Sequence, residues 1–213
     1  MAPIFTKSAR PVCRQRTVSG WLWALPMLML LAACATDVVV SPPQEELRAR
    51  QDRMMLEQIG SRARHGDWLV IRGYHATDHL VAAATNIPLS HAAMLDMENR
   101  QVIEADATGV HVSSLADFVH RSHRLLVIRP VWSDEKSAPL AVRKASSLVG
   151  EKYDFLGTVG IDDKSRYYCS ELTVYAYSDY HGKHQKIPRV VEPGQLYLWG
   201  QVVYDSRPRD EME

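Results

Sequence analysis

The sequence predicts an α+β domain in which an antiparallel sheet packs against a helix that carries a cysteine. Apolar runs at 68–71 and 125–128 are typical of buried strands. Residues 90–95 and 101–105 also have the pattern of strands, and the segment between them has the length of a hairpin connection. Behind Cys169, apolar residues recur with the period of a helix, which supplies the other layer of the domain.

The composition of the 213-residue chain is that of a globular protein. Hydrophobic residues make up 46% and charged residues 23% of the sequence, which is enough apolar material for one domain with its own core. The chain has 25 basic and 25 acidic residues, and this balance does not indicate the basic face that nucleic-acid binding requires. We therefore expect no nucleic-acid partner.

The N-terminus has the three parts of a bacterial export signal. A basic stretch without acids comes first, and the apolar run Trp21–Leu30 that follows is short for a membrane span. The run ends in Leu31-Ala32-Ala33-Cys34, which resembles the lipobox of bacterial lipoproteins. The resemblance implies that residues 1–33 are removed and that Cys34 is diacylated. Ala35 stands where an aspartate would resemble an inner-membrane retention signal, so we expect an outer-membrane anchor with the domain facing the periplasm.

Removal of the signal changes the cysteine and charge balance. Cys13 leaves with the signal and Cys34 carries lipid, so Cys169 is the only thiol expected in the mature chain. The four basic residues of the signal also leave, so 21 basic and 25 acidic residues remain, a net charge of −4. A single thiol in an oxidising compartment indicates either a reactive role or burial, and both interpretations stay open here.

The mature chain divides into four segments. Residues 34–43 read as a lipidated tether, and residues 44–65 as an exposed amphipathic helix that packs on the domain. The domain itself spans 66–205, and we expect the tail at 206–213 to be frayed. Between its first two strands, residues 74–88 could cover the site as a lid. The remaining elements expected in the domain are a helix at 78–84, a strand or turn at 109–112, a capped helix from 114, a helix between Pro139 and Gly150, and strands at 196–198 and 202–204.

The expected hairpin predicts a contact between a histidine and a carboxylate. If Leu95 pairs with Arg100, the antiparallel register places His91 directly opposite Glu104. A slip of one residue would move Glu104 to the other face of the sheet. Asp106 lies two residues further on and shares the face of Glu104, so either carboxylate could orient the imidazole.

Cys169 is expected at the N-terminus of its helix. Ser170 is a good N-cap residue, and Glu171 suits the positive end of a helix. A thiol at this position has a lowered pKa and is more often the nucleophilic thiolate at neutral pH. Acyl transfer by a thiol needs a base and an acceptor that orients the base, and Cys169, His91 and Glu104 have these three chemistries. Each also has a structural explanation, as a buried cysteine, a core histidine and a surface glutamate.

Four motifs in a fixed order resemble the permuted papain-like hydrolases of the YiiX type, relatives of the NlpC peptidoglycan endopeptidases. They are Ser90-His91-Ala92-Ala93-Met94, Val102-Ile103-Glu104-Ala105, Gly150-Glu151-Lys152-Tyr153-Asp154 and Tyr168-Cys169-Ser170-Glu171-Leu172. The histidine precedes the cysteine, as in the permuted branch of this superfamily, and the resemblance spans roughly Gly66 to Trp199. It implies a permuted papain-like fold with Cys169 as nucleophile, His91 as base, Glu104 as the orienting residue and Tyr153 as an oxyanion donor beside the Cys169 N–H. Aromatic packing would explain Tyr153 nearly as well.

The resemblance implies a cysteine peptidase or amidase that cleaves amide bonds through a thioester. For a lipoprotein of the cell envelope we expect peptidoglycan peptides as substrates, without a cofactor. Two alternatives remain: an acyltransferase or thioesterase that acts on acyl lipids, and a silent lipoprotein that binds peptidoglycan or a partner enzyme. We expect no zinc site, because the histidine pairs 120/123 and 181/184 have no second cluster or cysteine beside them.

Overall fold

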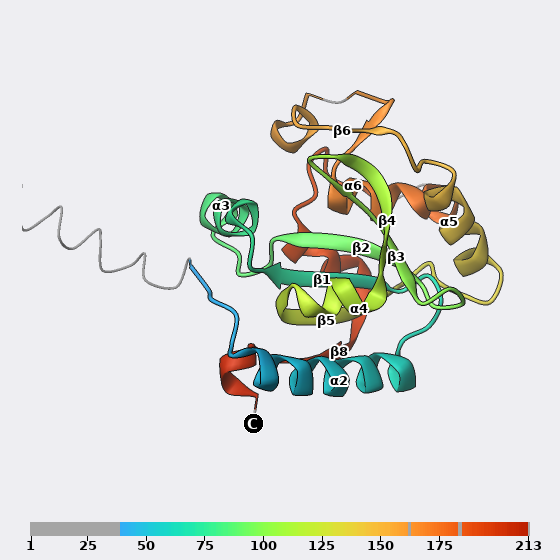
Figure 1. The fold of residues 1–213 in the computed structure, drawn as a ribbon. Coiled ribbons are helices and arrows are strands. Elements are labelled where there is room, and N and C mark those ends of the chain that lie inside the picture. Colours follow the sequence, from blue (N-terminus) through green and yellow to red (C-terminus); the bar gives the residue numbers. More distant parts are fainter. Residues whose placement is uncertain (1–38, 162, 183–184, 213) are drawn as a thin grey trace, which may run out of the picture. The chain divides into compact units, whose positions relative to one another are not determined.

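The computed structural model describes residues 39–161, 163–182 and 185–212 (Figure 1). The expected signal peptide at 1–33, the lipidation site Cys34 and the first residues of the expected tether lie outside this range. Of the helices in the described part of the chain, none combines the length and apolar character that crossing a membrane requires.

A six-stranded antiparallel sheet forms the centre of the domain, with the strand order β4-β3-β2-β1-β5-β8. Its strands are β1 (Trp68–Gly73), β2 (His91–Asp96), β3 (Gln101–Asp106), β4 (Gly109–Ser114), β5 (Ser122–Pro130) and β8 (Gly200–Asp205). Two short strands, β6 (Lys152–Tyr153) and β7 (Arg166–Tyr167), pair in parallel beside it. The α+β class and the antiparallel sheet are therefore confirmed.

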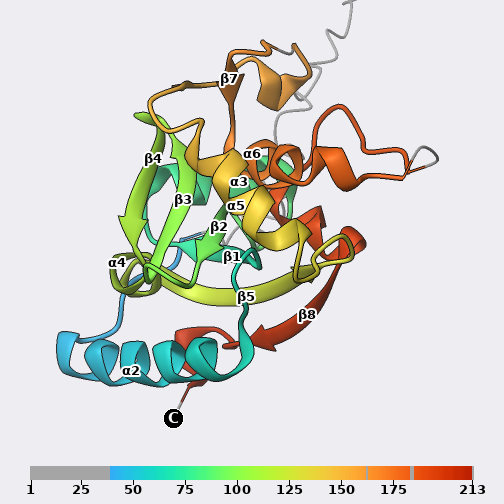
Figure 2. The same cartoon turned by 90° about the vertical axis from the view of Figure 1, so that its right-hand side faces the viewer.

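Helices cover both faces of the sheet (Figures 1 and 2). On one face, α2 (Glu45–Arg62) and α4 (Leu115–His120) enclose a core of aliphatic side chains with Phe118. On the other face, α5 (Ser137–Ser146) and α6 (Cys169–Ala176) enclose a second core that contains Trp68 and Tyr177. Burial of two separate apolar faces explains why the central strands are apolar throughout rather than alternating.

The N-terminal helix and the C-terminal tail pack on each other. Met55 and Ile59 of α2 are fully buried, as expected for a helix that packs on the domain. The prediction of a frayed tail at 206–213 is wrong for the described residues, because Arg209 is only 1% exposed. Its guanidinium donates to the carbonyls of Ser122 and Val119 and to Asp52 of α2. Hydrogen bonds to main-chain carbonyls, which the sequence pattern does not reveal, hold the tail in place.

The hairpin register differs from the prediction by two residues. Asp96 pairs with Gln101 and Ala93 with Glu104, so His91 lies diagonal to Glu104 rather than directly opposite. The turn is shifted because the Asp96 carboxylate accepts hydrogen bonds from Asn99, while Arg100 takes a left-handed conformation with φ of 53°. A shift of two residues keeps both side chains on the expected face.

One further expectation is wrong and another is confirmed. Residues 196–198 form part of a 3₁₀ helix, η4 (Pro193–Trp199), rather than a strand. The expected helix at 78–84 is present as α3 (Ala76–Thr85), and it is tied to the sheet because Ser90 Oγ donates to Asp78 at 2.6 Å.

Candidate active site

Cys169 is the first residue of α6, and its side chain is 6% exposed. The expected cap was Ser170, but Tyr168 is the N-cap residue and Ser170 lies within the helix, where its hydroxyl donates to the Val191 carbonyl at 2.6 Å. The periodicity behind Cys169 predicts one apolar face with Leu172, Tyr175 and Ala176, but Tyr175 is 39% exposed. The first-turn N–H groups of a helix have no carbonyl partner within it, so this position supplies the partial positive charge that a thiolate requires.

Three groups hydrogen-bond the Cys169 sulfur: the side chain of His91 and the main-chain N–H groups of Ala92 and Ser170. The pairing of β2 with β3 stops at Ala93. Just beyond this end of the paired segment, the Ala92 N–H donates to the sulfur of Cys169. Burial raises the pKa of the Cys169 thiol, but the hydrogen bond and charge of His91 and the two N–H donors outweigh it, and the pKa falls below its ordinary value.

His91 connects the thiol to a buried carboxylate. Its Nε2 atom lies 2.6 Å from Glu104 Oε2, which leaves Nδ1 for the hydrogen bond with Cys169. Burial opposes the charged imidazole, but its bonds to Cys169 and Glu104 prevail and raise the pKa of His91 to about 10. Burial likewise opposes ionisation of Glu104, whose pKa is nevertheless lowered because His111, His91 and Arg121 surround it. Cys169, His91 and Glu104 thus form one hydrogen-bonded chain, and the directions of their pKa shifts favour a thiolate, an imidazolium and a carboxylate.

Glu104, rather than Asp106, is the carboxylate that contacts His91. Glu104 is fully buried, whereas the Asp106 side chain is 38% exposed and accepts hydrogen bonds from Thr108. The two acids share a face of β3, as the alternation predicts, but only the inner one reaches the imidazole.

Three further residues contact Glu104, and sequence reasoning missed all of them. Ser113 Oγ donates to Glu104 Oε1 at 2.5 Å, His111 Nε2 lies 3.5 Å from the same oxygen, and Arg121 donates to Oε2. His111 and Ser113 alternate on β4, where His111 pairs directly with Glu104. Pairing the strand of Glu104 with the following strand in the sequence could have predicted both His111 and Ser113. Arg121 follows α4, and no sequence pattern places it there.

Tyr153 lies in β6, close enough to Cys169 for the thiolate charge to affect it. Burial, followed by that negative charge, raises the pKa of Tyr153 above its ordinary value, so the phenol stays protonated and can donate. Its ring also packs edge-on against Phe155, with centroids 4.7 Å apart. Aromatic packing and donation are thus compatible, and the oxyanion role remains a prediction.

The loop behind Tyr153 is built around Asp154, which is 1% exposed. Its carboxylate accepts hydrogen bonds from the N–H groups of Gly157 at 2.8 Å and Asp163 at 3.2 Å. A Cβ at Gly157 would lie 2.3 Å from Asp154 Oδ2, so glycine is required there. The Tyr-Asp-Phe-Leu-Gly segment therefore encodes a turn that the buried Asp154 carboxylate holds directly after Tyr153.

The paired histidines serve structural contacts. His120 bonds Asp52 at 2.7 Å, His123 lies 3.4 Å from Asp210, and the His181 ring stacks on Trp132 at 4.0 Å. His184 lies outside the described residues. Among the residues that the structure describes, no group of three His, Cys, Asp or Glu side chains could hold a metal ion.

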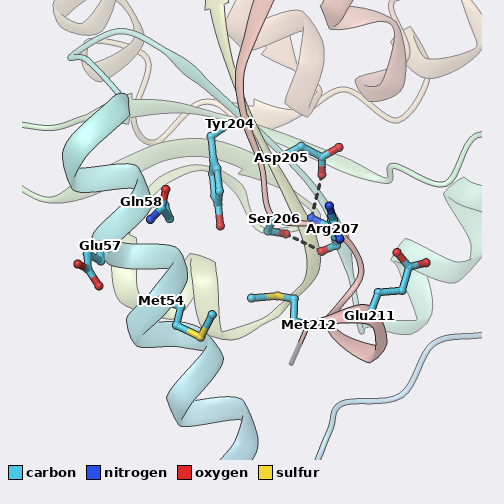
Figure 3. A pocket seen from close by; sticks show the side chains of 9 residues that line it. All are labelled: Met54, Glu57, Gln58, Tyr204, Asp205, Ser206, Arg207, Glu211 and Met212. Atoms are coloured by element: carbon cyan, nitrogen blue, oxygen red, sulfur yellow. Dashed lines mark hydrogen bonds between the residues drawn. The ribbon is translucent and has the colours of Figure 1, made fainter.

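A cavity of about 640 Å³ lies between α2, the end of β8 and the tail (Figure 3). Met54, Tyr204 and Met212 give it apolar walls, and Glu57, Asp205 and Glu211 add acidic groups. None of Cys169, His91, Glu104 and Tyr153 lines this cavity. The hydrogen-bonded chain of titratable groups therefore defines the candidate site better than the cavity does.

Residues 64–196 match the family model of the permuted papain-like amidases of the YaeF/YiiX type, the C92 family. The chain belongs to this family. Among solved structures, this YaeF/YiiX-type amidase is similar to the metalloprotein yiiX from Escherichia coli O157:H7, with 22% identity and a TM-score of 0.47 over 56% of this chain and 67% of that one. A comparison with curated proteins found no match.

Family membership makes this YaeF/YiiX-type protein a papain-like hydrolase of the cysteine peptidase class. It confirms the permuted fold and the enzyme class expected from the four motifs. The matched segment contains all four candidate residues, His91, Glu104, Tyr153 and Cys169.

Proposed function

We propose that the protein hydrolyses amide bonds with Cys169 as nucleophile, His91 as acid and base, and Glu104 as the residue that orients His91. The observation that carries this proposal is the continuous hydrogen-bonded chain from the sulfur through the imidazole to the buried carboxylate, with 2.6 Å between His91 Nε2 and Glu104. A buried imidazole with a carboxylate on one nitrogen and a thiol on the other has the geometry of a base that activates a nucleophile.

In the first half of the reaction, the Cys169 thiolate attacks the carbonyl carbon and the carbonyl oxygen becomes an oxyanion. On this proposal the Cys169 N–H and the Tyr153 hydroxyl donate to it, and one such donor contributes on the order of 3 kcal/mol to lowering the barrier. The C–N bond then breaks, His91 Nδ1 gives its proton to the leaving amine, and a thioester remains. In the second half, His91 takes a proton from water, whose oxygen attacks the thioester and releases a carboxylic acid and the thiolate.

We infer that the substrates are peptidoglycan peptides and that Cys34 anchors the protein to the outer membrane. The lipobox and the alanine at position 35 support the anchor, and peptidoglycan stem peptides are the abundant amides within reach of it. A Cys34→Ser variant should no longer incorporate labelled fatty acid in a bacterial host. Equal labelling of both proteins would refute the anchor.

A second candidate substrate class, acyl lipids, is favoured by one observation. The loop between β6 and β7 exposes four large apolar side chains, Phe155, Leu156, Val159 and Ile161, by 58–72%. Exposed apolar groups that cluster near an active site are typical of surfaces that bind apolar partners. On this alternative the same thioester chemistry would act on an acyl lipid.

Mass spectrometry of muropeptides and of lipid extracts, each incubated with the full chain, separates these candidates. Cys169→Ala is the control, since it removes the sulfur and leaves the fold intact. New muropeptide products from the wild type alone would support the first substrate class, and changed lipids the second. Identical profiles for both proteins on both pools would instead favour a lipoprotein that binds without catalysis.

A further inference from the structure

The proposed triad leaves one feature unexplained, which is the crowding around Glu104. A carboxylate that only orients an imidazole needs one contact, yet this one has four. Besides His91, it contacts Ser113 and His111 from β4 and Arg121 from the end of α4. These four groups contact both oxygens of the carboxylate, so they occupy most of the hydrogen bonds that it can accept.

Arg121 is the partner of Glu104 that carries a permanent positive charge, and it shares Oε2 with His91. Its guanidinium also lies over the Phe118 ring, 4.9 Å from the centroid. Its Nε atom is buried without a hydrogen-bond partner, so this placement leaves one donor of the guanidinium unsatisfied. The contact with Glu104 is what this placement achieves.

We propose that Arg121 is a positioning residue of the active site: with Ser113 it fixes the Glu104 carboxylate towards His91 and reduces the negative charge that His91 experiences. This inference rests on the proposed function of Cys169 and His91. A fully charged, unshared carboxylate would hold the imidazolium proton too firmly for transfer to a leaving amine. By dividing the charge of Oε2 between two cations, Arg121 keeps His91 an effective acid.

The other groups around this network cannot replace Arg121. Ser113 is neutral. The hydrogen bond of His111 is the strongest single influence that lowers the Glu104 pKa, but it acts on the other oxygen, Oε1, and His111 also lies 3.7 Å from Asp106. Among these partners of Glu104, only Arg121 acts as a cation on the oxygen that His91 uses. Cys169 faces His91 from α6 and carries the opposite charge.

The test uses the full chain and two pH profiles that need no substrate: the rate of Cys169 alkylation by iodoacetamide, and the NMR titration of the His91 ring. In Arg121→Met, the loss of a nearby cation should raise the pKa of His91 by about one unit or more. Arg121→Lys keeps the charge and should restore the wild-type profile. Ser113→Ala, a smaller change that preserves folding if Arg121→Met does not, should give a smaller upward shift.

The matched control is Arg129→Met. Arg129 also binds a fully buried carboxylate, that of Asp67, at 2.8 Å, and its side chain is 21% exposed against 24% for Arg121. This variant should lower thermal stability and leave both pH profiles unchanged. The inference is overturned if Arg121→Met keeps the wild-type profiles, or if Arg129→Met shifts them equally. A wild-type thiol that ionises only near its ordinary pKa would overturn the proposed function itself, which is a distinguishable result.

Discussion

Glu104 and Asp67 are both fully buried, and each is bound by an arginine, yet their pKa values are shifted in opposite directions. Burial raises the pKa of Asp67, and its bonds to Arg129 and to the Arg64 N–H do not fully offset this effect. At Glu104 burial acts in the same direction, but two histidines and Arg121 together reverse it, and the pKa is lowered. The number of cationic partners, rather than burial, therefore distinguishes the two carboxylates.

This difference separates a structural ion pair from one that belongs to the proposed catalytic chain. Asp67 connects the turn before β1 to Arg129 on β5 and has no titratable partner that must change state. Glu104 contacts His91, whose proton has to move during the proposed reaction. An acid that remains charged beside a mobile proton is what catalysis needs.

The largest expected effect comes from neutralising each acid in turn. Glu104→Gln should lower kcat/KM by roughly 10²–10⁴-fold, because an amide cannot stabilise the imidazolium or fix its tautomer. Asp67→Asn should change the same constant by less than about threefold, since Asp67 touches neither His91 nor Cys169. Hydrolysis assays on a responsive muropeptide or lipid substrate measure both constants. Comparable losses in the two variants would remove the functional distinction between the acids.

Two largely buried histidines, with side chains 13% and 11% exposed, extend the comparison. His91 has a pKa raised to about 10, whereas burial lowers the pKa of His123 below its ordinary value of 6.5 despite the charge of Asp210. NMR titration of the ring protons should therefore find His91 charged and His123 neutral at pH 8. In Glu104→Gln the His91 pKa should fall while that of His123 stays unchanged. A neutral His91 at pH 7 in the wild type would contradict the ion-pair description.

These comparisons also show how far the sequence could predict the site. Local periodicity predicts the Cys169 helix and the His91 strand. One expected hairpin then predicts that His91 and Glu104 share a face of the sheet. The register was wrong by two residues because Arg100 adopts a positive φ, and single-sequence patterns do not specify such turns.

The contacts that give Glu104 its charge state were beyond the sequence. Arg121 and the tail residue Arg209 act on elements remote in sequence, and both bind through long flexible side chains. The periodicity of the sequence does not predict where the end of a long, flexible side chain lies. Only the packing of the folded chain determines the position of its charge. The three residues of the proposed triad were therefore predictable from the sequence, whereas the groups that shift their pKa values were not.

Thiol reactivity should respond less strongly than catalysis. Because Cys169 has a lowered pKa, wild-type alkylation by iodoacetamide should reach its plateau below the ordinary thiol range. In His91→Ala the sulfur loses its nearest cation while the Ala92 and Ser170 N–H groups remain, so the alkylation pKa should rise by about one to two units. Asp67→Asn is the matched control and should leave the curve in place. Wild-type and His91→Ala curves that coincide would indicate an ordinary buried cysteine.

The smallest expected effect is on acid stability, where the two carboxylates should act with opposite signs. Glu104 binds its proton less readily in the folded than in the unfolded chain, so its stabilising contribution is present above pH 4.5 and is lost as the pH falls. Asp67 binds its proton more readily when folded, so acidification favours the folded state at this site. Between pH 6 and pH 3, the free energy of unfolding should fall less steeply in Glu104→Gln than in the wild type, and more steeply in Asp67→Asn.

Chemical denaturation at several pH values measures these slopes. For Glu104→Gln a difference on the order of 1–3 kcal/mol between pH 6 and pH 3 is expected, because Glu104 accepts charge-assisted hydrogen bonds. The comparison of slopes is independent of the stability that each variant loses at neutral pH, since a neutral amide adds no titration of its own. Slopes that change in the same direction in both variants would show that burial alone governs these acids. Opposite changes would show that the partners of Glu104 keep it ionised where an equally buried acid becomes easier to protonate.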